Sequence, residues 1–274
     1  MPTLYLVATP IGNLEDITLR AIRTLREVAL IAAEDTRTTR KLLSHYEIRT
    51  PLTSYNDRNK RLKAPVILDR LRDADVALVS EAGMPTISDP GQDLVVAAWE
   101  MGARVVPLPG PSAITAALAV SGLPSRTFTY LGFLPRQTGA RRRLLRSVAA
   151  RTDTLVAFET PHRLRDALAD IQQELGDRPL AVCRELTKLY EEVFRGPVSE
   201  ALERFQEPRG EFTLVIAGSP DAEAEASPDT DYAVREEMRQ LRTEGLSAQE
   251  ALSRLASRHG LSRRRLYRLW LSIK

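Results

Sequence analysis

The chain has 274 residues, of which 43% are hydrophobic, and a formal net charge of +3. This length can bury two hydrophobic cores, so we expect two main domains and a small appendage. The net charge is too small to indicate a nucleic-acid partner by itself. Cys183 is the single cysteine, which excludes an intramolecular disulfide, and its apolar neighbours favour a buried, inert thiol.

The sequence gives no support for a metal site or a membrane anchor. The three histidines, His45, His162 and His259, lie far apart and lack metal-ligand spacing, so we expect no metal. No apolar run approaches the length of a membrane span, and the first residues read as a strand rather than as a signal peptide. The sequence therefore predicts a cytoplasmic protein.

Short apolar runs alternate with helix-like segments through the first 122 residues. Gly102 and Gly122 follow helical runs, while Asp16 and Ser112 precede such runs as expected N-caps. Trp99 is expected on the buried face of its helix. This rhythm predicts a buried parallel sheet. The expected strands are residues 4–8, 30–33, 52–55, 76–79 and 103–108, and helices are expected at 17–28, 37–46, up to about 72, from 92 and from 113.

Two loops rich in glycine and proline follow the strands at residues 76–79 and 103–108. They cover residues 81–91 and 109–112, and ligands of parallel sheets bind beyond the carboxyl ends of the strands. Their glycines allow close backbone approach, and Asp89 supplies one carboxylate. Neither loop is a Walker A motif, and no GxGxxG is present. The loops would suit a cationic or neutral adenosine-type ligand, or they are ordinary tight turns.

A second α/β half is expected after a boundary at residues 123–126. Its strands are expected at residues 127–134, 154–158, 180–184, 190–195 and 211–217, with helices at 161–176 and 199–205. An acid-free run at residues 136–151 predicts a surface for a polyanion, and the alternative is a solvated helix face. Its basic residues are Arg136, Arg141, Arg142, Arg143, Arg146 and Arg151.

The end of the chain reads as a separate helical module. Residues 219–231 are acidic and nearly free of large apolar side chains, which is typical of a linker. Three short helices are expected at 233–243, 248–258 and 263–273, resembling a helix-turn-helix with leucines 252, 255, 261, 266 and 269 as its core. The alternative is a dimerisation or packing bundle. The expected nucleic-acid contacts are Arg263, Arg264, Arg265 and Arg268.

Several motifs carry a family resemblance that runs in order through residues 4–218. Residues 9–13 (TPIGN), 80–91 (SEAGMPTISDPG) and 106–113 (VPLPGPSA) resemble the tetrapyrrole-methylase-like, class III S-adenosylmethionine methyltransferases. Four further motifs resemble one branch of them, the ribosomal RNA small-subunit methyltransferase I branch, which 2′-O-methylates a cytidine in the decoding centre of 16S rRNA. They are AEDTR at 33–37, GFLP at 132–135, ETPHR at 159–163 and RELTK at 184–188.

The resemblance implies an α/β fold of two domains with a cofactor cleft between them, plus a small C-terminal helical domain. The corresponding expectations are an N-terminal α/β domain at 1–122, a second at 123–218, a linker at 219–231 and a nucleic-acid-binding helical domain at 232–274. A homodimer is also implied. The branch usually has a stretch near HDHNE where residues 56–60 read NDRNK, so only Asp57 and Asn59 match and the histidines have no counterpart.

By the same resemblance, the cofactor is S-adenosyl-L-methionine and the partner is 16S rRNA within the small ribosomal subunit. The implied cofactor-binding residues lie in the first turn, the two glycine-rich loops and the wall of the second half. They are Ile11, Ala82, Gly83, Ile87, Asp89, Pro111, Ser112, Ala113, Phe158 and Leu186. The rRNA contacts are expected at Arg136, Arg141, Arg142 and Arg143, together with the arginines of the last helix.

Methyl transfer to a ribose hydroxyl requires in-line geometry and benefits from a base that accepts the hydroxyl proton. The candidates are Asp35, Glu81, Glu159, Glu185 and Lys188, and each could instead form a structural ion pair. A tetrapyrrole C-methyltransferase would share the fold and the cofactor. A non-enzymatic DNA-binding regulator would use only the C-terminal helices, which leaves the large N-terminal portion unexplained.

Overall fold

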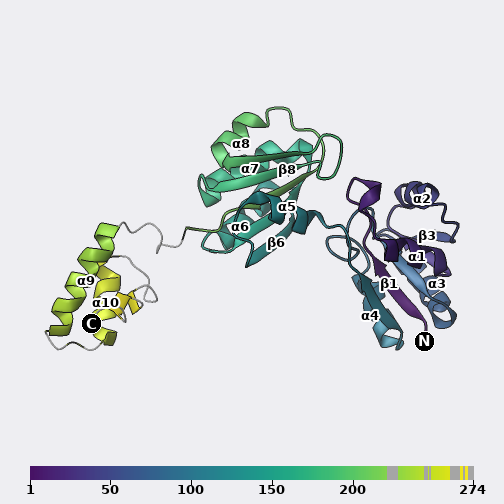
Figure 1. The fold of residues 1–274 in the computed structure, drawn as a ribbon, viewed down its shortest axis with the longest axis horizontal. Helices are drawn as coiled ribbons and strands as arrows, with labels where there is room; N and C mark the ends of the chain where they lie inside the picture. The colour runs from purple at the N-terminus through teal and green to yellow at the C-terminus, as the bar shows by residue number, and fades with distance from the viewer. Residues whose placement is uncertain (221–227, 244–245, 247, 260–265, 268, 271–274) are drawn as a thin grey trace.

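The computed structural model describes residues 1–220, 228–243, 246, 248–259, 266–267 and 269–270 (Figure 1). The N-terminal half is built on a five-stranded sheet in the order β3-β2-β4-β1-β5, and all of its strand pairs are parallel. Its strands are β1 (Thr3–Val7), β2 (Leu30–Ala33), β3 (Leu52–Ser54), β4 (Val76–Val79) and β5 (Arg104–Leu108). The predicted parallel sheet is therefore confirmed.

Helices cover both faces of this sheet. One hydrophobic core joins α1 (Leu19–Glu27) and α2 (Thr36–His45) to the sheet, and a second core joins α3 (Lys60–Asp73) and α4 (Gln92–Glu100) to the other face. Two details of the predicted elements were wrong. The N-cap of α1 is Thr18 rather than Asp16, because residues 14–16 form a 3-10 turn capped by Asn13. Trp99 is 61% exposed, so it does not lie on the buried face of its helix.

The second half is built on a mixed five-stranded sheet in the order β6-β7-β10-β8-β9. β6 and β7 are parallel, whereas β10 pairs antiparallel with both β7 and β8. The last strand of the sequence therefore lies at the centre of the sheet. The strands are β6 (Phe128–Phe133), β7 (Thr154–Glu159), β8 (Pro179–Arg184), β9 (Glu192–Pro197) and β10 (Phe212–Ile216).

The two faces of the second sheet are covered by helices from different parts of the chain. α6 (Thr138–Val148), α7 (Pro161–Leu175) and α8 (Val198–Arg204) enclose the larger core with one face. α5 (Ala113–Ser121) covers the other face, where Ile114, Ala117 and Leu118 pack on Val156, Val215 and their neighbours. The expected domain boundary after residue 122 assigns α5 to the N-terminal half, although α5 packs on the second sheet.

The C-terminal region contains α9 (Pro228–Thr243) and α10 (Ala248–His259), which pack through a small core that includes Met238 and Leu255. α9 begins five residues earlier than expected, since Pro228 occupies its first position, where proline is well tolerated. Leu261 and the arginines at 263, 264, 265 and 268 lie outside the described residues. Among the residues described, we find no helix with the length and apolar character needed to traverse a bilayer.

Candidate functional site

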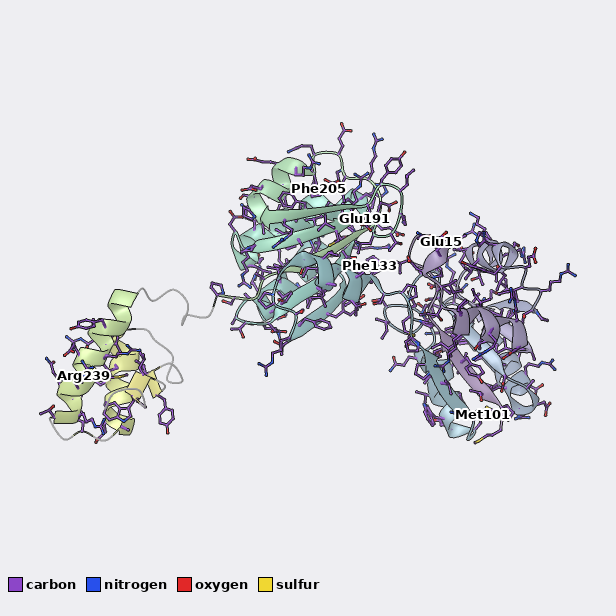
Figure 2. All side chains as sticks on the ribbon, viewed as in Figure 1. Glu15, Met101, Phe133, Glu191, Phe205 and Arg239 are labelled. Carbon is purple, nitrogen blue, oxygen red and sulfur yellow. The ribbon has the colours of Figure 1, made fainter. Side chains whose placement is uncertain are left out.

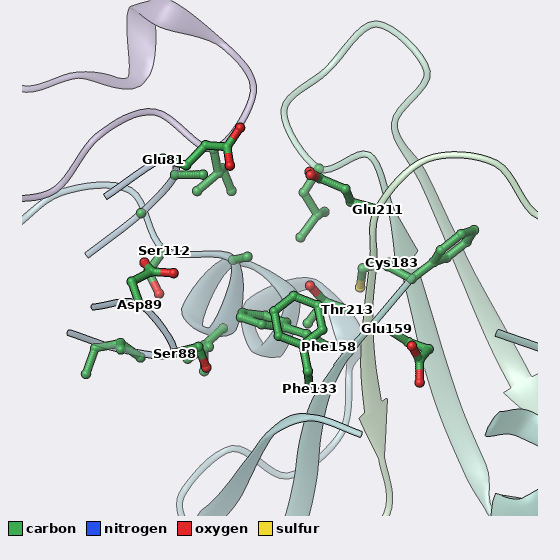
Figure 3. Close-up of a pocket in the computed structure, with 18 of the residues that line it drawn as sticks. Glu81, Ser88, Asp89, Ser112, Phe133, Phe158, Glu159, Cys183, Glu211 and Thr213 are labelled. Atoms are coloured by element: carbon green, nitrogen blue, oxygen red, sulfur yellow. The ribbon is translucent and has the colours of Figure 1, made fainter. Parts of the chain in front are cut away.

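A cavity of about 390 Å³ lies where the loops of the N-terminal sheet meet the second sheet (Figure 3). One wall comes from the 81–91 loop after β4 and from Ser112 at the start of α5. The opposite wall comes from Phe133, Phe158, Thr213 and other side chains of the second half. The cavity therefore lies at the carboxyl ends of the parallel strands, where sheets of this class bind ligands.

The 81–91 loop is held in an unusual backbone conformation. Gly83, Thr86, Ser88 and Gly91 all have positive φ, with values of 79°, 73°, 68° and 136°. Left-handed backbone is costly for a β-branched residue such as Thr86, so the surrounding structure must hold it in place. Thr9 and Gly83 exchange two backbone hydrogen bonds of 2.9 Å, which tie the first turn to this loop. Strain of this kind is typical of functional sites.

Direct contacts join the two walls. The Ser88 and Tyr130 hydroxyls lie 2.5 Å apart, and the Asn13 backbone N–H donates to the Thr187 hydroxyl over 3.0 Å. Gly12 also approaches the second half so closely that a Cβ there would clash with Cγ of Lys188 and lie 2.9 Å from the Leu186 carbonyl oxygen. Any larger residue would push the walls apart, so glycine at this position preserves the cavity.

The described lining of the cavity is acidic and contains no Lys, Arg or His. Burial raises the pKa of Asp89 to about 7, and the charges of Glu34 and Glu81 add to the shift. Burial is also the main cause of the raised pKa of Glu34. Carboxylates so placed favour a ligand that carries positive charge. The acidic residues of the lining are Glu34, Glu81, Asp89, Glu159 and Glu211, of which Glu159 is paired with Arg163 and Glu211 with Lys188.

The cofactor-binding residues implied by the sequence converge on this cavity with one exception. Pro111 does not line it, although the Pro111 carbonyl lies 3.7 Å from the position that a Cβ on Gly83 would take. All the others do: Ile11, Ala82, Gly83, Ile87, Asp89, Ser112, Ala113, Phe158 and Leu186. The structure thus brings together residues that are separated by as many as 175 positions in the chain.

Of the candidate bases, Asp35 has a structural role. Its carboxylate caps α2 by accepting from the Arg37 backbone N–H over 2.7 Å and pairs with the Arg37 guanidinium at 2.7 Å. These hydrogen bonds lower the pKa of Asp35 to about 2. Asp35 does not line the cavity, whereas Glu81 does. The Glu81 carboxylate accepts a hydrogen bond from the Thr38 hydroxyl over 3.3 Å.

Glu159 borders the cavity, but its carboxylate belongs to the other face of the second sheet. It follows Leu155 and Ala157 in the alternation of β7, and its Oε1 lies 2.6 Å from the Arg163 guanidinium on α7. Its Oε2 is the buried side-chain oxygen without a hydrogen-bond partner among the described residues. Burial raises the pKa of Glu159, with hydrogen bonding and Arg163 opposing the shift. The carboxylate is therefore turned away from the site.

Glu185 and Lys188 form an ion-pair cluster outside the lining. The Lys188 ammonium donates to Glu185 over 2.9 Å and to Glu211 over 2.8 Å. Burial disfavours the ammonium, but these two carboxylates outweigh it and raise the pKa of Lys188. A lysine that stays protonated cannot act as a base.

The arginine run divides into buried and exposed members. Arg141 is 2% exposed and, with Arg142, holds the buried carboxylate of Asp170 at 2.6 and 2.7 Å. The expected RNA contact at Arg141 is therefore wrong, because a buried guanidinium cannot reach a phosphate. Arg136 and Arg143 are exposed, and no salt bridge to them occurs within the described residues. Arg146 and Arg151 pair with Glu174 and Asp153.

Sequence reasoning missed several lining residues. Glu211 and Thr213 reach the cavity because β10 is central in the second sheet, which no spacing rule indicates. Cys183 also lines the cavity, and burial raises its pKa to about 12, which agrees with an inert thiol. Phe133 lies in the GFLP motif, and this motif was the one signal that could have identified it.

The NDRNK stretch at 56–60 serves the N-terminal half as a structural connection. The Asn56 side-chain amide donates to the Glu34 carbonyl over 3.3 Å, and the Asn59 side chain bonds Asn56 N–H and the Ser54 hydroxyl. Lys60 pairs with Asp57 at 2.9 Å. These residues support the backbone beside Glu34 without lining the cavity described above.

Comparison with known proteins places this chain in a family. The sequence model described as Tetrapyrrole (Corrin/Porphyrin) Methylases matches residues 3–202. Solved structures share the fold: uroporphyrin-III-C-methyltransferase from Thermus thermophilus has a TM-score of 0.57 at 20% identity, over 79% of this chain and 94% of that one. A cobalt precorrin-4 methyltransferase has the same TM-score at 17% identity, over the same shares of the two chains.

Relatives of higher sequence identity are named ribosomal RNA small subunit methyltransferase I. One from Synechocystis is 46% identical over 100% of this chain and 99% of its own, and one from Halalkalibacterium halodurans is 45% identical over 98% and 94%. The relative from Thermotoga maritima is 52% identical over 99% of its length but only 80% of this chain. The chain therefore belongs to the ribosomal RNA small subunit methyltransferase I family of tetrapyrrole methylases, and its cofactor is S-adenosylmethionine.

Proposed function

We propose that this protein 2′-O-methylates the ribose of a decoding-centre cytidine in the 16S rRNA of the small ribosomal subunit. One observation carries the proposal: the family's loops enclose an acidic cavity whose described lining lacks a cation. The names of the relatives indicate the rRNA substrate. Exposed Arg136 and Arg143 supply positive charge near Phe133 in sequence, as a phosphate-rich partner requires.

The cavity fits S-adenosylmethionine by its chemistry. This cofactor carries a sulfonium and an ammonium group against one carboxylate, so its net charge is positive, and it supplies an electrophilic methyl group when bound. The carboxylates of Asp89 and Glu34 would hold that positive charge, and the left-handed Gly83 lets a ligand approach the backbone. Phe158 and Leu186 offer apolar contact for the remainder of the cofactor.

Glu81 is the candidate base that this geometry favours. It lines the cavity, its side chain is exposed, and its backbone N–H is fixed by a 3.2 Å hydrogen bond to the Glu34 carboxylate. A carboxylate at this position would accept the proton of the ribose hydroxyl, an effect worth about 10²–10⁴ in rate. The carboxylate of Asp35 is committed to α2 and that of Glu159 to Arg163.

The test is methyl transfer from labelled cofactor to three substrates: undermethylated small subunits, free tetrapyrrole and duplex DNA. We expect label only in the subunits, recovered as 2′-O-methylcytidine after nuclease digestion and mass spectrometry. A Glu81→Gln protein should bind the cofactor normally and transfer label slowly. Label in the tetrapyrrole alone would replace the proposal by the C-methyltransferase alternative.

We propose that the C-terminal helices dock the enzyme on rRNA. The Thermotoga maritima relative is matched by 221 residues, about the number that precede the end of the described α/β portion at Pro220. A chain truncated after Pro220 should therefore fold and bind the cofactor, but it should need more subunits to reach the same single-turnover rate. If it stays slow at saturation, the tail instead orders the catalytic cavity.

A homodimer in the cytoplasm completes the proposal. Val96 and Trp99 on α4, with Met101 after it, expose apolar side chains by 48%, 61% and 37%. Side chains of this size gathered on one helix favour burial against a second copy. Light scattering should give twice the chain mass for the wild type and a lower mass for Trp99→Lys, whereas a monomeric wild type would contradict the dimer.

A further inference from the structure

Phe133 is an exposed aromatic side chain at the edge of the cavity. It is 54% exposed, although phenylalanine is normally buried, and it lies on the side of the second half that faces the N-terminal half (Figures 2 and 3). Ile87 is the other large apolar side chain of the described lining that is exposed. Exposure of this kind at a binding site calls for an explanation in terms of a ligand.

The backbone turns Phe133 toward the cavity by a specific device. β6 and β7 pair Tyr130 with Val156 but Phe133 with Phe158, so β6 has one residue more than β7 in this interval. Without this bulge, Phe133 would lie on the face opposite to Tyr130, because side chains alternate along a strand. Gly132 takes up the bulge with φ of +70°. Bulges re-aim side chains next to active sites.

The ring of Phe133 packs against a second aromatic ring and is still more than half exposed. It meets Phe158 at 5.4 Å between centroids and 63° between planes, an edge-to-face contact. Phe158 in turn meets Tyr130, whose hydroxyl is fixed by Ser88. Three aromatic side chains therefore form a supported row with Phe133 outermost, and Arg136 follows three residues later on the exposed surface.

We propose that Phe133 is the platform on which the target nucleobase stacks when its ribose enters the cavity, an inference that rests on the proposed function. Proteins that recognise unpaired RNA stack bases on exposed aromatic rings beside basic side chains. Enzymes that draw one nucleotide of a nucleic acid into a cavity take it out of its stack. An exposed ring at the edge of the cavity replaces the lost stacking, and exposed arginines nearby would hold the flanking phosphates.

The first test compares Phe133→Leu, which removes the aromatic face, with Phe133→Tyr, which retains it. Phe128→Leu is the matched control, since Phe128 lies on the same strand, is 43% exposed and does not line the cavity. We expect Phe133→Leu to lower kcat/KM for small subunits by roughly 5- to 150-fold, the range for one stacked base. Phe133→Tyr and Phe128→Leu should stay close to the wild type. Equal activity of Phe133→Leu and Phe128→Leu would overturn the inference.

The second test separates the target base from the adenine of the cofactor. Calorimetry with the demethylated form of the cofactor, in the absence of RNA, should give the same affinity for the wild type and for Phe133→Leu. A weaker affinity of Phe133→Leu in this measurement would mean that the ring holds the cofactor, and the inference would be wrong.

The third test asks whether the ring and the base act on each other. Removing the ring of Phe133 and removing the target base should delete the same contact. Subunits reconstituted with 16S rRNA that lacks the target base should therefore bind the wild type and Phe133→Leu with equal affinity. Losses that multiply would contradict stacking. A wild type that methylates no subunit RNA would instead refute the proposed function, so the two failures are distinguishable.

Discussion

The two walls of the cavity are made by two sheets of different kinds. The N-terminal wall consists of strained loops at the ends of parallel strands and carries half-buried carboxylates, among them Asp89 and Glu34. The wall of the second half consists of strand residues from a mixed sheet and presents a row of aromatic rings. We propose that the carboxylates of the first wall hold the charge of the cofactor and that Phe133, at the edge of the second, holds the target base, so variants at these residues should affect different ligands.

The largest expected effect is loss of cofactor binding in Gly83→Val. A Cβ at Gly83 has room, with neighbours at 3.7 Å, but φ of +79° is strained for a β-branched residue. The loop should shift and the cofactor should no longer bind, as measured by calorimetry. Gly102→Val is the control, because Gly102 has nearly the same φ, +77°, and nothing within 4 Å of the added atom. Equal affinities in the two variants would remove the loop from the cofactor site.

Arg141→Ala tests which arginines of α6 serve the fold. Removing Arg141 leaves the buried Asp170 carboxylate with Arg142 alone, so we expect the free energy of unfolding to fall by about 3–5 kcal/mol. Denaturant titration measures this change. Affinity for RNA in the folded variant should be that of the wild type. If the variant were as stable as the wild type but bound RNA more weakly, the result would support the original expectation that Arg141 contacts RNA.

The next largest expected effect is the pH dependence of cofactor affinity, which comes from Asp89 in the N-terminal wall. The pKa of Asp89 is raised by burial to about 7, so its carboxylate is increasingly protonated as pH falls below 7 and should then bind a cationic cofactor less tightly. We expect affinity to weaken by about tenfold per pH unit well below pH 7 for this single group. In Asp89→Asn, the affinity for the cofactor should be low and should not change between pH 6 and 8.

The same carboxyl group has an opposite effect on stability. Because its folded pKa lies above the unfolded value, its charge destabilises the cofactor-free protein progressively as pH rises from about 4 to 7. Asp89→Asn should therefore raise the Tm of the cofactor-free protein at pH 8 and change it little at pH 4. A Tm difference that is the same at both pH values would show that Asp89 is not buried as described.

The smallest expected effect concerns Arg136 and Arg143. Replacing both by alanine should flatten the dependence of RNA affinity on salt by up to about one unit of slope for each lost contact. Cofactor affinity and Tm should not change, since both side chains are exposed. An unchanged salt slope would return these arginines to the role of a solvated helix face.

The sequence predicted the N-terminal sheet and the two glycine-rich loops beside the cavity from local signals, whereas the individual lining residues were implied by the family resemblance. Buried apolar runs fix the strands, and the loops of a parallel sheet follow from them. It could not predict that α5 packs on the second sheet, since periodicity shows that a helix has an apolar face but not which partner covers it. It also misjudged Arg141, because a buried ion pair depends on Asp170, which is distant in the chain.

Phe133 illustrates the same limit at the scale of one residue. Alternation along β6 would have turned it away from the cavity, and only the bulge at Gly132 reverses its direction. A bulge changes the register by a single residue, and neither composition nor hydrophobic period records it.

The central place of β10 has a consequence for synthesis of the protein. Strands β7 and β8 are joined through β10, which leaves the ribosome last of the five, so the second sheet cannot close until the chain reaches Ile216. Until then α5, translated long before, has no complete surface for Ile114 and Leu118. The N-terminal sheet can fold during translation, whereas the second sheet can form only after β10 has been synthesised. A nascent chain stalled before Phe212 would therefore expose apolar surface and depend on chaperones.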